Sequence, residues 1–425
     1  MQEPHTLTAT EAARQIRDGT LKSEKLVASC LARIKAREPV VDAWAYLDAD
    51  RALAQARALD RGTVQGPLHG IPIGVKDIID TADMPTAYGS PIYRDHRSGW
   101  DAASVAIARA AGAIVLGKTV TSEFALYHAG KTKNPLDPAR SAGISSMGSA
   151  AAVADRMVPI AFGTQTGASI LKPATFCGAI GYKPSFGTFN RTGVHPAADS
   201  LDTLGHFARS IDDVALFGAV LSGRPDFGAG SLEKPPVIGL CRTAEWAKAD
   251  AAMKGALEEA ATRLGKAGAV IREVELPDPC RGLNEACLTV IRYESARALA
   301  HEYRVWPEGL SEVLRRTITQ GLAYSHDQYL EALTLAQKCR ALVAPIFEQV
   351  DVLMTPPSEC EAPLVKDVIG DSVFNRLWTI LHLPCLALPT GKTATGLPAA
   401  IQLVGSMHGD DALLRVARWV EARYA

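Results

Sequence analysis

Apolar and polar positions alternate along this chain with the two periods that distinguish helices from strands. Apolar residues recur at spacings of three and four over 8–18 and 23–37, each segment begun by a capping-type Thr or Ser, which predicts two helices. Further helices are predicted over 48–59, 102–111 and 250–267. Short apolar runs bounded by turn residues predict strands over 41–47, 71–75, 113–116, 237–240, 269–275, 350–354 and 384–388.

Strands and helices follow one another through the whole chain. Residues 237–275 form a strand–helix–strand pattern, which is typical of two parallel strands joined by a crossover helix. No stretch rich in Pro, Ser or Gly and no block of like charge separates one part of the sequence from another. The pattern therefore predicts one large α/β domain rather than separable modules.

Charge and cysteine usage narrow the class of protein. The chain has 425 residues, and its 45 Lys and Arg residues balance 46 Asp and Glu residues. This balance gives no basic surface for nucleic acid or a membrane, so we expect a small-molecule partner. Eight cysteines without CxxC pairs fit the reduced thiols of a cytoplasmic protein and indicate no zinc site. The first 20 residues lack the apolar core of a signal peptide, which also predicts a non-secreted protein.

Small residues are concentrated between 134 and 184, where Gly, Ser, Thr and Ala leave backbone N–H groups open to a ligand. Such groups can bind a phosphate or stabilise an oxyanion beside a nucleophilic serine. Residues 112–119 match the letters of a phosphate-binding P-loop, but their middle has the apolar pattern of a strand. The oxyanion interpretation is favoured, with Ser169 as candidate nucleophile; the alternative is a serine in an ordinary tight turn.

A nucleophilic serine needs a base, and no histidine pattern supplies one. The chain has no GxSxG elbow and no HExxH motif. Lys76 follows the apolar run 71–75, and an amine buried there would favour its neutral form and accept a proton. The alternative is a lysine that extends its ammonium group to water.

Six motifs stand in order along most of the chain. Lys76 lies in GPLHGIPIGVKD, a Ser-Ser pair in GISSMGSAAAVA, and Ser169 in GTQTGASILKPATFCGAIGYKP; the others are GKTVTSEFA, NPLDPAR and GLPAAIQLVG. Together they resemble the amidase signature family. The resemblance implies a mixed, largely parallel sheet flanked by helices, and amide hydrolysis by a Ser–cis-Ser–Lys triad without metal or organic cofactor.

The resemblance also implies how the chain is organised. It predicts a single amidase domain over 1–425. Within it, 1–60 would form an N-terminal helical cover and 61–225 the signature core. The remaining part, 226–425, would complete the sheet and the substrate pocket.

Individual residues receive roles from the same resemblance. Ser169 would attack the carbonyl carbon, Ser145, preceded by a cis peptide bond, would relay its proton, and neutral Lys76 would accept it. Ser145 is assigned because Ser169 stands 24 positions after it, the separation found in the family. Ser146 would make a supporting hydrogen bond. The oxyanion would be bound by the backbone N–H groups of Thr166, Gly167, Ala168 and Ser169.

Several positions depart from the usual motifs of the family. Ile144 and Met147 stand where glycine is usual, and Ala168 would add strain if its position requires a positive φ. Gln165 and Leu171 replace an acid and a base that could pair, so neither charge is left alone.

Substrate-binding residues are predicted near these motifs. Lys172 becomes the cation nearest the nucleophile and would bind a substrate carboxylate, as in the malonamidase-like members that this variant most resembles; the alternative is a lysine packed outward on a helix. Trp378 and the adjacent Asn375 and Arg376 would line the pocket, although a Trp is more often a core residue. Cys177 is expected to be a small buried residue.

We therefore predict a cytoplasmic amidohydrolase that cleaves the C–N bond of a small carboxylic amide through a seryl acyl-enzyme, with acyl transfer to hydroxylamine as a side reaction. Three alternatives stay open: a carbamate or ester hydrolase of the same family, an amidotransferase subunit that releases ammonia to a partner, and a binding protein that kept the fold. A homodimer is compatible with these features.

Overall fold

A computed structural model describes residues 3–126, 130–365 and 371–424, and its strands form one sheet. The strands are β1 (Trp44–Leu47), β2 (Pro72–Lys76), β3 (Ile114–Thr119), β4 (Ile160–Gln165), β5 (Ile180–Lys183), β6 (Thr203–Ala208), β7 (Val237–Leu240), β8 (Val270–Glu273), β9 (Val352–Thr355), β10 (Cys385–Lys392) and β11 (Pro398–Val404). Their order across the sheet is β1-β3-β2-β4-β6-β5-β10-β11-β9-β7-β8.

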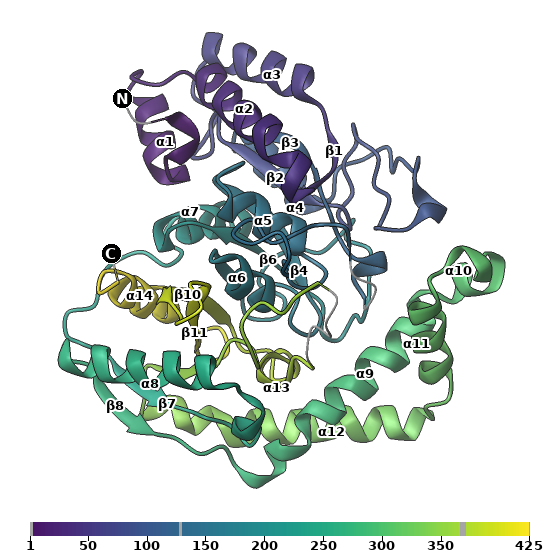
Figure 1. The fold of residues 1–425 in the computed structure, drawn as a ribbon, viewed down its shortest axis with the longest axis vertical. Helices are drawn as coiled ribbons and strands as arrows, with labels where there is room; N and C mark the ends of the chain where they lie inside the picture. The colour runs from purple at the N-terminus through teal and green to yellow at the C-terminus, as the bar shows by residue number, and fades with distance from the viewer. Residues whose placement is uncertain (1–2, 127–129, 366–370, 425) are drawn as a thin grey trace.

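Fourteen α-helices lie in the described ranges. They are α1 (Ala9–Arg17), α2 (Ser23–Val41), α3 (Ala49–Arg61), α4 (Ala103–Ala110), α5 (Met147–Ala154), α6 (Leu171–Cys177), α7 (Ile211–Ser222), α8 (Ala251–Lys266), α9 (Leu283–Ala298), α10 (Ala300–Val305), α11 (Glu312–Leu322), α12 (His326–Val343), α13 (Val373–Ile380) and α14 (Asp410–Glu421). The helices α1, α2 and α3 gather at one end of the molecule, and α8 and α12 lie at the opposite end (Figure 1).

The sheet is mixed, as the sequence predicts. β2 pairs in parallel with β3 and β4, and β7 pairs in parallel with β8 and β9. Between these two groups, β6, β5, β10 and β11 pair in antiparallel fashion. Parallel pairing is therefore confined to the two flanks, a smaller share than expected. The hairpin that joins β10 to β11 shows the reason, because a connection this short requires antiparallel neighbours.

The predicted elements are present, and their edges differ where local contacts intervene. α1 begins with a capping box, in which Thr8 and Glu11 bond each other's backbone N–H groups. α2 continues to Val41, beyond the predicted end at 37. The carboxylate of Glu38 accepts the N–H group of Trp44 at 2.8 Å, and this contact holds the turn between helix and strand. As a result β1 starts at Trp44 rather than at the predicted position 41.

The P-loop lookalike is a strand, as its apolar middle predicts. All six residues of β3 are buried, including Gly117 and Lys118. The Nζ atom of Lys118 lies 3.2 Å from a carboxylate oxygen of Asp77 and is not free to bind a phosphate. The predicted strand–helix–strand unit is also confirmed, because α8 connects the parallel strands β7 and β8.

Two further observations concern the chain as a whole. None of the helices in the described ranges has both the length and the apolar character needed to cross a bilayer. Each of the eight cysteines is free, and seven of them are buried. Burial raises the pKa of the Cys177 thiol, so this residue is the small buried side chain that the sequence predicts.

Candidate active site

Lys76, the last residue of β2, is fully buried at the centre of the candidate site. Its Nζ atom lies 2.6 Å from Oγ of Ser145 and 2.7 Å from Oγ1 of Thr164. It forms no ion pair with a carboxylate of the described residues. Burial lowers the pKa of the Lys76 ammonium group well below its ordinary value of 10.5, and the Asp202 carboxylate offsets part of this shift. The lysine does not extend to water, and its neutral form can accept a proton.

Ser145 lies in the turn that precedes α5, and its backbone corrects one prediction. No peptide bond of the described residues is cis, so the bond between Ile144 and Ser145 is trans. A trans bond is expected on energetic grounds, because a cis bond before a residue other than proline costs about 3–4 kcal/mol. The chain reverses direction instead through a positive φ of 37° at Ser145. The side chain nevertheless points at Lys76.

Ser146 makes the supporting contact that its position predicts. Its Oγ donates to the carbonyl oxygen of Thr164 at 3.0 Å and accepts from the Thr164 N–H group at 3.3 Å. These two bonds tie the start of α5 to the end of β4. Because Thr164 also contacts Lys76 through its hydroxyl group, β4 aligns the lysine with the serine loop.

Ser169 lies between β4 and α6, at the wall of a cavity of about 370 Å³. It is 5% exposed, and its Oγ forms no hydrogen bond with any described residue. Ile144, Gly167 and Ala168 line the same cavity. The structure thus joins Lys76 to Ser145 directly and places Ser169 at the cavity reached by the same serine loop, without a hydrogen bond between the two serines.

The backbone before Ser169 offers donors to this cavity. The N–H groups of Gly167, Ala168 and Ser169 make no hydrogen bond with the described part of the chain. The carbonyl oxygen of Gly167 accepts from Oγ1 of Thr379 at 2.9 Å. Since C=O and N–H of one planar peptide point in opposite directions, the Ala168 N–H group faces away from Thr379. Ala168 has no positive φ, so its methyl group adds no strain there.

Gln165 holds the nucleophile loop together. Its Oε1 accepts the N–H groups of Ile170 at 2.9 Å and Leu171 at 3.1 Å, at the start of α6. Its Nε2 donates to Thr379 at 3.0 Å. A neutral amide therefore supplies both an acceptor to the helix and a donor to α13, which explains how the site tolerates the loss of the usual acid.

Three supporting residues were not identified from the sequence: Thr164, Thr379 and Asp202. Asp202 is buried and accepts from the Thr166 hydroxyl group at 2.6 Å. Burial raises the pKa of this carboxyl group from 3.8 to about 6, although hydrogen bonds from Thr166 and from backbone N–H groups oppose the shift. Thr164 stands inside a recognised motif. No local pattern marks Asp202 or Thr379.

Two of the predicted substrate-binding residues lie elsewhere. Lys172 is fully buried on α6, its Nζ is 2.7 Å from Oε2 of Glu359, and it is not among the described residues that line the cavity. Trp378 is fully buried in the hydrophobic core. Arg376, two positions earlier on α13, does line the cavity. Residues two apart on a helix point in directions about 200° apart, so only one of this pair can face the cavity.

The walls of the cavity are mainly apolar. Its lining includes Leu126, Ile144, Leu288 and Ile291, together with the charged residues Arg292, Arg376 and Asp371. Within the described ranges, no group of three or more His, Cys, Asp or Glu side chains is arranged to hold a metal ion. The arrangement can position a small, partly apolar molecule against Ser169.

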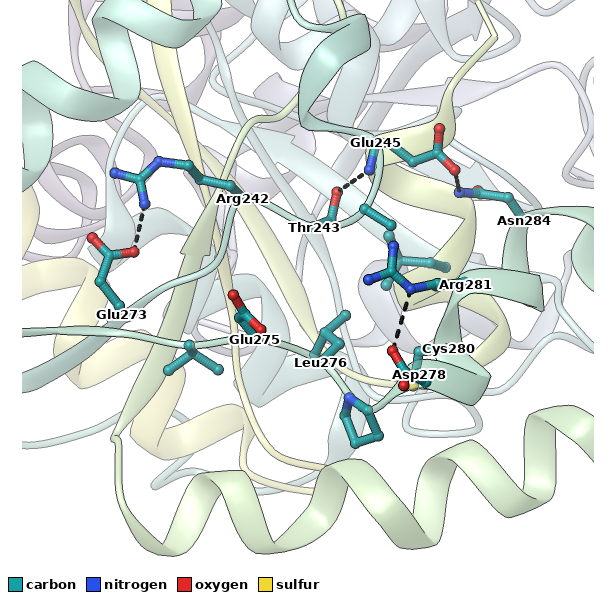
Figure 2. A pocket seen from close by; sticks show the side chains of 14 residues that line it. Arg242, Thr243, Glu245, Glu273, Glu275, Leu276, Asp278, Cys280, Arg281 and Asn284 are labelled. Atoms are coloured by element: carbon teal, nitrogen blue, oxygen red, sulfur yellow. Dashed lines mark hydrogen bonds and ion pairs between the residues drawn. The ribbon is translucent and has the colours of Figure 1, made fainter.

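A second cavity, of about 320 Å³, lies between the segments that follow β7 and β8. None of the predicted catalytic residues lines it. Figure 2 shows that its charged side chains form pairs, Arg242 with Glu273 and Arg281 with Asp278. The charges around this cavity are therefore compensated within the protein.

Comparison with known proteins identifies similar chains over nearly the whole length. The model of the family described as "Amidase" matches residues 25–414. One relative belongs to the glutamyl-tRNA(Gln) amidotransferase of Chloroflexus aurantiacus, of which it is one subunit. It is 33% identical over 469 aligned residues, which cover 98% of this chain and 96% of the relative.

Solved structures agree with this result. A crystal structure of an amidase is 31% identical and superposes with a TM-score of 0.91, covering 99% of this chain and 100% of that one. The peptide amidase of Stenotrophomonas maltophilia is 28% identical with a TM-score of 0.84, covering 99% and 97% of the two chains. None of these three is described as malonamidase-like, so that finer resemblance stays a prediction.

Proposed function

The chain belongs to the amidase signature family, and from this premise we propose that it hydrolyses the C–N bond of a small carboxylic amide through an acyl-enzyme on Ser169. One observation carries the proposal: a fully buried lysine amine lies 2.6 Å from Ser145 and has no carboxylate partner in the described structure. An amine in this setting has no structural ion pair to maintain. Its lowered pKa suits a general base near neutral pH.

The reaction has two halves. Oγ of Ser169 attacks the amide carbon, and its proton passes through Ser145 to Lys76, while the N–H groups before Ser169 bind the oxyanion. Collapse of the tetrahedral intermediate breaks the C–N bond, and the proton held by Lys76 returns through Ser145 to the leaving ammonia or amine. Water then attacks the acyl-enzyme by the same proton path and releases the carboxylic acid. Approach of Ser169 to Ser145 is the step that substrate binding must complete.

A labelling experiment tests the nucleophile. We expect an alkyl fluorophosphonate to add one mass increment to the protein, on Ser169, and to stop release of ammonia from a panel of small amides. Ser169→Ala should remove both labelling and turnover. Ser231→Ala, at an exposed loop position, serves as the matched control. Turnover that survives in Ser169→Ala would rule the acyl-enzyme out.

The second candidate function is that of an amidotransferase subunit. It is favoured by the similarity to the amidotransferase subunit of Chloroflexus aurantiacus over nearly the full length of both chains. An enzyme of this kind would pass ammonia to a partner protein. Release of ammonia by the isolated chain without ATP, together with a self-contained assembly in light scattering, would count against it. Amide, ester and carbamate substrates of one shape separate the remaining alternatives of the same chemistry.

A further inference from the structure

Two arginines face the cavity that contains Ser169. Arg376 comes from α13 and Arg292 from α9, and the only carboxylate of the described lining residues is Asp371. Guanidinium groups stay charged at every pH that a protein tolerates. The wall of the cavity therefore carries more positive than negative charge, in contrast to the second cavity, where each arginine is paired (Figure 2).

Arg376 is buried but incompletely paired. Its side chain is 5% exposed, and its Nη1 contacts the carbonyl oxygen and the carboxylate of Asp371. The Nε–H group is buried without a hydrogen-bond partner. Asp371 itself is 60% exposed, so solvent screens much of its charge. A buried donor that is left unpaired costs free energy, which a ligand oxygen can recover.

Arg292 adds a second positive charge with no acid beside it. Its Nη1 donates to the hydroxyl oxygen of Tyr324 at 3.2 Å, and it forms no ion pair with an acid of the described structure. A phenol hydroxyl group orients the guanidinium without neutralising it. The cavity is thus prepared for an anion on two of its walls.

The position of Arg376 connects this charge to the chemistry. A Cβ atom at Gly167 would lie 3.6 Å from Cγ of Arg376, so the arginine stem packs against the loop that carries the nucleophile. An anion held by Arg376 is therefore close to the scissile carbonyl group. In a cavity of about 370 Å³, both groups belong to one small molecule.

We propose that the substrate is an amide that also carries a carboxylate, such as the half-amide of a short dicarboxylic acid, and that Arg376 recognises the carboxylate with Arg292 beside it. This inference rests on the proposed amide hydrolysis. The carboxylate would accept from the free Nε–H of Arg376, and the apolar walls formed by Leu288 and Ile291 would contact the methylene groups between the two ends. An ammonium group in place of the carboxylate would be repelled.

The first test compares substrates on the unaltered enzyme. The half-amides of malonic, succinic and glutaric acids are each paired with their methyl esters, which keep the amide and remove the charge. We expect kcat/KM for the best half-amide to exceed that of its ester by about 10- to 100-fold, the value of a charge-assisted hydrogen bond. Equal or better cleavage of the neutral amide would overturn the inference.

Substitutions then assign the preference to a residue. Arg376→Gln should remove most of this ratio and leave the hydrolysis of the neutral amide within about threefold, because the charge contributes to binding only. Arg292→Gln, at a half-buried position, should lower the same ratio less. Arg281→Gln, at a highly exposed site outside the cavity, is the matched control and should leave the ratio unchanged. A ratio that survives in both cavity variants would refute the assignment.

A binding measurement separates this inference from the proposed function. Calorimetric titration of Ser169→Ala protein with malonate, succinate and glutarate requires no turnover. Binding of one dicarboxylate that weakens at least tenfold in the Ser169→Ala, Arg376→Gln double variant supports acid recognition even if no amide is hydrolysed. If amides are hydrolysed but no dicarboxylate binds and the ester is preferred, the proposed function stands and the substrate class is wrong.

Discussion

Replacing Lys76 with methionine keeps the length of the side chain and removes the amine, which tests the protonation state of the buried base. In the unfolded chain the amine binds a proton at every pH below about 10.5, whereas burial lowers its pKa well below this value in the folded protein. Between the two values the unfolded state therefore binds one more proton than the folded state. The free energy of unfolding must then rise with pH across this window.

The size of the effect follows from linkage. One proton of difference changes the free energy of unfolding by about 1.4 kcal/mol per pH unit. Lys76→Met lacks this contribution, so the wild-type free energy minus that of the variant should increase with this slope toward alkaline pH. At neutral pH the lysine destabilises the fold relative to its alkaline state, a cost that is consistent with its retention for catalysis.

Urea unfolding at pH 7, 8 and 9 measures both proteins under matched conditions. Lys35→Met, at an exposed position of α2, controls for the loss of a lysine side chain. The same samples should show a loss of kcat/KM of about 10²- to 10⁴-fold in Lys76→Met, the usual contribution of a general base. A difference in unfolding free energy that stays constant from pH 7 to 9 would mean that Lys76 keeps its ordinary pKa, and the proposed role as base would fail.

Three further predictions concern the residues that support the site. Asp202→Asn removes a carboxyl group whose pKa is raised to about 6. Relative to this variant, the wild type should lose up to about 3 kcal/mol of stability as pH rises from 4 to 6 in urea unfolding, and the variant's kcat/KM should reach its plateau at lower pH because Lys76 loses a nearby negative charge. Thr379→Val removes the bond to the Gly167 carbonyl oxygen and should lower kcat about tenfold with KM unchanged in steady-state kinetics; a change in KM alone would contradict the positioning role. Ala168→Gly should lower the Tm, by an amount equivalent to about 0.4–1 kcal/mol, because the native φ is not positive; a rise in Tm would show that the methyl group strains the loop.

Much of the fold and the three candidate catalytic residues could be predicted from the sequence, because their signals are local. A strand buried on both faces reads as a continuous apolar run, as in β2 and β3. Backbone donors beside a serine require small residues next to one another in the chain, so Ser145 and Ser169 stand inside recognisable motifs. The end of an apolar strand desolvates a lysine wherever the strand is buried, and Lys76 was found in this way.

Only the tertiary structure decided which charges face the substrate. Lys172 follows the nucleophile by three positions, yet Glu359, 187 positions away in the chain, occupies its amine. Arg376 reaches the cavity because of the rotation of α13, and Thr379 reaches Gly167 from a segment 212 positions away. A side chain's partner depends on how distant elements pack, and neither periodicity nor a motif encodes that packing. The trans bond before Ser145 likewise depends on the backbone path of its turn, which its motif does not specify.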